Sequence, residues 1–77
     1  MSHKVLDTVV LARDLPEHGL CAGDLGAVVE VYATDGLEVE FVTASGRTKA
    51  LVTLESGDVR AIADSDLVAV RYLERSA

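Results

Sequence analysis

The sequence is poor in cysteine, proline and aromatic residues, and each shortage excludes a class of protein. The single cysteine, Cys21, excludes an intrachain disulfide and a zinc site made of four cysteines. With one phenylalanine, two tyrosines and no tryptophan, the chain lacks the aromatic clusters that line proline-peptide grooves or stack on single-stranded nucleic acid. Its single proline leaves long stretches free to form strands.

Basic residues are scarce as well. The chain has 7 lysines and arginines against 13 aspartates and glutamates, which gives a net charge of −6. This balance argues against binding to duplex nucleic acid or to an anionic membrane surface, and it permits a basic protein partner. No run of about 18 apolar residues is present. Because Asp7 interrupts the apolar residues near the start, we expect no signal peptide and a cytoplasmic protein.

The residues in which the chain is rich predict one small all-β domain. Hydrophobic residues make up 49% of the chain, valine is the commonest residue, and turn residues recur at short intervals. The predicted strands cover residues 8–11, 27–32, 37–42, 48–54 and 59–63, with a short 3₁₀ turn at 55–58. About five antiparallel strands in this order are typical of a small SH3-like barrel. An OB-fold is the main alternative, but it usually carries a helix where only residues 44–47 are available.

The C-terminal segment carries a separate prediction. We expect residues 1–63 to form the barrel. Residues 64–77 would form an extra C-terminal strand or tail that packs on the barrel or on a neighbouring subunit. Two valines and a tyrosine within residues 67–73 favour a strand over a helix.

Four sequence blocks resemble a known family. They run from Leu15 to Leu20, from Gly23 to Tyr32, from Glu38 to Val42 and from Gly46 to Thr48. Together they are similar to domain-of-unknown-function family 4926, a set of short bacterial proteins, over roughly residues 6–62. The resemblance implies an SH3-like barrel. It implies no activity, because none is established for the family.

Alternation along the predicted strands leaves more apolar side chains outside than one small sheet can cover. In the second strand, alternation from Leu25 directs Ala27, Val29 and Val31 inward and Val28 outward. The predicted interaction face consists of Val28, Tyr32, Val42, Leu51, Val68, Val70 and Tyr72. A contiguous apolar set fits either a tail that folds back over it or an interface with another chain. We expect self-association, as a dimer, or binding to an unidentified protein partner.

The long loop between the first two predicted strands carries an acidic cluster of Asp14, Glu17 and Asp24. In SH3-like folds the corresponding loop often contacts a peptide, and a negative patch can steer a basic partner. A loop that is only solvated is the alternative interpretation.

Two alternative functions depend on side chains with binding chemistry. His18 and Cys21, three residues apart and close to Glu17 and Asp24, are metal-ligand types, which makes a metal-handling accessory domain the first alternative. Nucleic-acid binding is the second, and the basic strip that it would use consists of Arg47, Lys49, Arg60 and Arg71.

Catalysis is not expected. A nucleophile and base pair made of Cys21 and His18 would need a third orienting group, an oxyanion hole and a pocket, and a small barrel filled with valine and leucine has little room for a cleft. We therefore predict a non-catalytic interaction or assembly module with no metal and no cofactor. One form of it is an acidic accessory protein that neutralises a basic partner.

Overall fold

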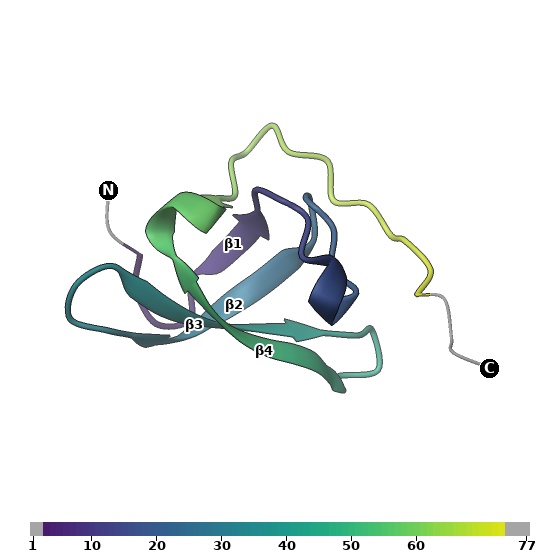
Figure 1. Ribbon diagram of the computed structural model, residues 1–77. Coiled ribbons are helices and arrows are strands. Elements are labelled where there is room, and N and C mark those ends of the chain that lie inside the picture. Colours follow the sequence, from purple (N-terminus) through teal and green to yellow (C-terminus); the bar gives the residue numbers. More distant parts are fainter. Residues whose placement is uncertain (1–2, 74–77) are drawn as a thin grey trace.

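Five antiparallel strands form a single sheet in the computed structural model, which describes residues 3–73 (Figure 1). The elements are β1 (Thr8–Leu11), the 3₁₀ turn η1 (Pro16–His18), β2 (Leu25–Val31), β3 (Gly36–Val42), β4 (Thr48–Glu55), the 3₁₀ turn η2 (Ser56–Asp58) and β5 (Val59–Ala61). Their order in the sheet is β4-β3-β2-β1-β5. The predicted all-β fold of five antiparallel strands is confirmed. The sheet is not closed, because β4 and β5 form its two edges.

Of the strand or tail predicted for the C-terminal segment, the part that the structure describes forms a tail within the single chain. Residues 64–73 contain neither strand nor helix, and Figure 1 shows them as an extended coil, from green to yellow, that runs past the sheet without joining it. A strand forms only when its backbone groups find a ladder partner, and β-propensity alone does not supply one. Residues 74–77 of the predicted segment lie outside the described residues.

Tight turns join the central strands and fix their register. Between β3 and β4, the backbone N–H of Thr43 donates to the carbonyl of Arg47 over 2.9 Å, and Gly46 takes a positive φ of 88°. Only glycine adopts this left-handed conformation without steric cost, which explains the Ser-Gly pair in this turn. From here β3 and β4 pair along their length, for example Val39 with Val52.

The core lies on one face of the sheet. Two loop residues, Leu15 and Leu20, exchange backbone hydrogen bonds of 2.9 and 3.1 Å and close the long loop over it. As the alternation predicts, Phe41 of β3 points inward and is 2% exposed. The core cluster consists of Val9, Leu11, Leu15, Leu20, Val28, Leu37, Val39, Phe41, Val52, Leu54 and Val59.

The predicted orientation of β2 is wrong, and with it the assignment of Val28 to the interaction face. Val28 is completely buried, whereas Leu25 and Val31 are 37% and 42% exposed. The residue that shares the inner face with Val28 is Gly26, which has no side chain and therefore gives no hydrophobic signal in the sequence. A register shift between Val28 and Glu30 also breaks the alternation within the strand. Because side chains alternate, an error of one residue moves every side chain to the other face.

The close packing of Gly26 can be tested by adding one methyl group. A Cβ at this position would lie 2.6 Å from Cγ1 of Val39 and 2.9 Å from Cε2 of Phe41. Gly26→Ala should therefore lower the free energy of unfolding in urea by about 1–3 kcal/mol, as overpacking of a core does. Gly57→Ala is the control, because nothing lies within 4 Å of its Cβ position. Equal stability of the two variants would contradict the packing argument.

Candidate interaction surface

The outer face of β2, β3 and β4 combines carboxylates with exposed apolar side chains. In β3, Glu38 and Glu40 point away from the core because their neighbours Leu37, Val39 and Phe41 point into it. The strand register places Glu38 opposite Glu30 of β2 and Thr53 of β4, and it places Glu40 opposite Leu51 of β4. We call this surface, made of Glu30, Tyr32, Glu38, Glu40 and Leu51, the acidic face.

Hydroxyl groups hold the two central carboxylates in place. Oε1 of Glu38 accepts hydrogen bonds from the hydroxyls of Thr53 (2.6 Å) and Tyr32 (3.2 Å), and Oε2 of Glu40 accepts one from Thr48 (2.6 Å). Burial, together with the negative charges of Glu38 and Glu30, raises the pKa of Tyr32 above its ordinary value. The tyrosine therefore stays neutral and able to donate at physiological pH.

The charge of the acidic face is not neutralised within the described part of the chain. The three ion pairs among residues 3–73 use the carboxylates of Asp24, Asp58 and Asp66, none of which belongs to the acidic face. Like charges directly opposite each other in a sheet, such as Glu30 and Glu38, are unfavourable for folding. The arrangement therefore leaves a local negative potential that a positive partner would relieve.

Apart from Val28, the residues of the predicted interaction face are exposed. On the sheet, Tyr32, Val42 and Leu51 are between 45% and 54% exposed. In the C-terminal segment, Val68, Val70 and Tyr72 are 69%, 98% and 85% exposed. Val42 and the three residues of the C-terminal segment line one groove, whereas Tyr32 and Leu51 belong to the acidic face.

The predicted acidic loop is not a free negative patch, because two of its three carboxylates have structural partners. Asp14 accepts the backbone N–H of Ala22 at 2.8 Å. Asp24 accepts the backbone N–H of Cys21 at 2.8 Å and also pairs with Arg71. Glu17 lies in η1. Short carboxylate side chains in loops often accept hydrogen bonds from nearby backbone N–H groups. A cluster of acidic residues in the sequence therefore does not by itself indicate a free negative patch.

The residues of the two alternative functions are dispersed or already engaged. No group of three or more histidine, cysteine, aspartate or glutamate side chains that could hold a metal ion occurs within residues 3–73. Cys21 is an exposed free thiol. In the predicted basic strip, Arg60 pairs with Asp66 and Arg71 pairs with Asp24. Among the described residues, no helix is long and apolar enough to cross a membrane.

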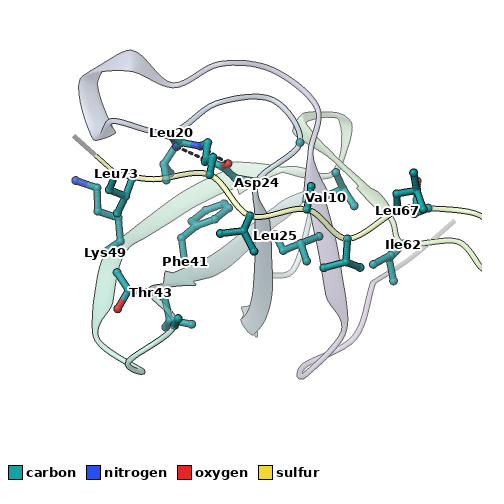
Figure 2. Close-up of a pocket in the computed structure, with 18 of the residues that line it drawn as sticks. Val10, Leu20, Asp24, Leu25, Phe41, Thr43, Lys49, Ile62, Leu67 and Leu73 are labelled. Atoms are coloured by element: carbon teal, nitrogen blue, oxygen red, sulfur yellow. Dashed lines mark hydrogen bonds and ion pairs between the residues drawn. The ribbon is translucent and has the colours of Figure 1, made fainter.

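A groove lies between the C-terminal segment and the sheet, with a volume of about 860 Å³. Figure 2 shows Phe41, Leu25, Val10 and Ile62 lined up along the path of the segment. The sequence led us to expect little room for a cleft, but the C-terminal segment and the sheet enclose this groove between them. The groove borders the core at Leu20 and Phe41, and no local pattern reveals it, because it depends on where the segment crosses the sheet.

Arg71 fixes that crossing point. Its Nε and Nη2 atoms donate to Oδ1 and Oδ2 of Asp24 at 2.8 and 2.7 Å, and Nη2 also donates to the carbonyl of Gly19 at 3.0 Å. This bidentate pair joins residues 47 positions apart. The Arg71 guanidinium lowers the pKa of Asp24, with a smaller contribution from the N–H of Cys21, while burial opposes both.

Comparison with known proteins places most of the chain in one family. The family model described as Domain of unknown function (DUF4926) matches residues 5–61. The match includes all five strands and ends with β5, so the groove-forming segment lies beyond it. No curated protein and no solved structure matches the chain.

Removing the Arg71 side chain should raise the pKa of Asp24 toward its ordinary value. A carboxylate with a lowered folded-state pKa stabilises the fold above its unfolded pKa, and this contribution disappears as the pH falls through the folded value. In the Arg71→Ala variant, the carboxyl group of Asp24 should therefore titrate at a higher pH than in the wild type. An NMR titration that follows the carboxyl carbon of Asp24 measures this change. Arg13→Ala, which breaks the pair with Asp58, is the control that leaves Asp24 unchanged. An unaltered Asp24 in Arg71→Ala would contradict the pairing.

Proposed function

The chain belongs to the DUF4926 family, and from the surface of this member we propose that it is a non-catalytic protein-interaction module. The partner that we propose is a basic protein, which this acidic chain accompanies or neutralises. The observation that carries the proposal is the acidic face, where Glu30, Glu38 and Glu40 lie beside Leu51 and Tyr32 without a cationic partner among the described residues.

The two kinds of side chain on the acidic face would contribute to different steps of binding. The net charge of −6 and the local carboxylates attract a basic partner over a distance and increase the rate of encounter. The apolar surfaces of Leu51 and Tyr32, 54% and 45% exposed, lose water on contact and slow dissociation. Neither kind of contact requires a pocket, which agrees with the shape of a strand surface.

Because the carboxylates of Glu38 and Glu40 are held in fixed positions, they favour recognition of a structured or extended basic surface. Glu38 and Glu40 are fixed by hydroxyl groups, so little side-chain entropy is lost when a lysine or arginine binds to them. Glu38 and Glu40 are two positions apart in β3, so their side chains lie on the same face of the sheet. A partner strand or helix with basic residues at matching spacing would contact both carboxylates together. No observation favours the metal-handling or nucleic-acid alternatives, and we do not propose them.

A pull-down from the cells that naturally produce the protein tests the proposal. Partners retained by the wild type should be basic proteins. Glu38→Gln together with Glu40→Gln should weaken their binding about tenfold at low salt and less at high salt, because screening already reduces the electrostatic contribution. Glu17→Gln removes a charge in η1, away from the acidic face, and should leave binding almost unchanged.

Leu51→Thr tests the apolar contribution in the same assay. Threonine keeps the strand propensity of an exposed β4 position and removes most of the apolar surface. We expect about tenfold weaker binding with unchanged salt dependence, because only burial is lost. Partners that bind all of these variants like the wild type, or that are acidic, would refute the acidic face as the binding site.

A further inference from the structure

The segment that follows β5 has the sequence of a strand but no strand to pair with. Residues 67–73 read Leu-Val-Ala-Val-Arg-Tyr-Leu, rich in β-branched and aromatic residues that favour strands. Their backbone makes no hydrogen bond to the backbone of another described residue. A stretch with high β-propensity and free backbone donors and acceptors can accept a second strand.

Ion pairs at two points hold this segment in position. Before it, Arg60 of β5 pairs with Asp66 through two hydrogen bonds of 2.9 Å, and the backbone N–H of Ala63 donates to the same carboxylate at 2.7 Å. These contacts lower the pKa of Asp66 to about 2. Within it, Arg71 pairs with Asp24. The ion pairs thus hold the segment in a fixed position, although it does not form a strand of the sheet.

The middle of the segment stands away from the sheet. Leu67 is 95% exposed and Val70 is 98% exposed, values that apolar residues rarely keep together on a free surface. These exposed fractions show that the chain's own sheet does not cover the two side chains, although the segment borders the groove of about 860 Å³ (Figure 2). The backbone of residues 67–70 is therefore open to a second chain.

We propose that residues 67–73 pair with the same residues of a second copy, as two antiparallel strands related by a two-fold axis through Val70. The groove and the two ion pairs remain within each copy, and the new contact joins only the exposed segments. A two-fold contact of this kind uses the same surface on both copies and closes as a dimer.

The sequence is self-complementary in this register. Val70 lies opposite Val70 of the second copy, and Val68 lies opposite Tyr72, a cross-strand pair of a β-branched and an aromatic residue that stabilises antiparallel sheets. Arg71 lies opposite Ala69. An axis through Arg71 would place two positive charges directly opposite each other, which is unfavourable. Charge and shape therefore select Val70 as the centre.

This proposal is independent of the proposed function. It uses residues 67–73, whereas the basic partner would bind the acidic face on β2, β3 and β4. A chain that dimerises without binding a basic protein would support this inference alone, and a monomer that binds a basic protein would support only the proposed function.

Sedimentation of the full chain at high micromolar concentration tests the pairing. We expect the wild type to sediment at twice the monomer mass. Val70→Pro removes a backbone donor from an exposed position outside the sheet, so it should give a folded monomer. Val70→Thr keeps the donor and the strand propensity and should remain dimeric. A monomeric wild type, a trimer or larger assembly, or a Val70→Pro variant that still dimerises would overturn the proposal.

Cysteine cross-linking tests the register in a Cys21→Ser background. Residues directly opposite in an antiparallel pair lie about 4.5–5.5 Å apart at Cα, within the range of a disulfide. Val70→Cys should therefore form an intermolecular disulfide rapidly. Leu67→Cys is the matched control at an equally exposed position. The two copies of residue 67 would lie about 20 Å apart in this register, so it should cross-link much more slowly. Equal rates for the two variants would refute a two-fold axis at Val70.

Discussion

The contact of Gly26 with Phe41 and Val39 is the constraint on which the arrangement of the sheet depends. A side chain at this position would overlap with both neighbours, so only glycine lets β2 approach β3 so closely. The contact sets the alternation of β2: Val28 points into the core, and Ala27 points out. With β2 and β3 fixed in this way, Glu38 and Glu40 are directed to the outer face.

The carboxylates of this protein have two separate uses. Asp14, Asp24 and Asp66 accept backbone N–H groups in loops and turns, and two of them also bind arginines that organise the C-terminal segment. These carboxylates stabilise local structure, and the charges of Asp24 and Asp66 are balanced by their arginines. Glu38 and Glu40 are held by neutral hydroxyls and keep their charge toward the solvent. The carboxylates of β3, unlike those of Asp24 and Asp66, therefore have no cationic partner among the described residues.

The C-terminal segment shows the difference between the propensity to form a strand and the formation of one. Residues 67–73 have the composition of a strand, and the sheet has two free edges at β4 and β5. Nevertheless, the pairs of Arg60 with Asp66 and Arg71 with Asp24 direct the segment past the sheet, and residues 67–73 form no backbone hydrogen bond with either edge. Side-chain ion pairs thus decide its path, and its backbone stays free.

The strands of the sheet, the turns between them and the inward direction of Phe41 could be predicted from the sequence, because alternation and turn chemistry are local properties. The sequence also indicated that Leu51, Val42 and Tyr32 are exposed. The orientation of β2, the role of Asp24 and the path of residues 67–73 became visible only in the folded chain. The reason is physical: a buried glycine gives no hydrophobic signal, and an ion pair between residues 47 positions apart depends on how distant parts of the chain pack together.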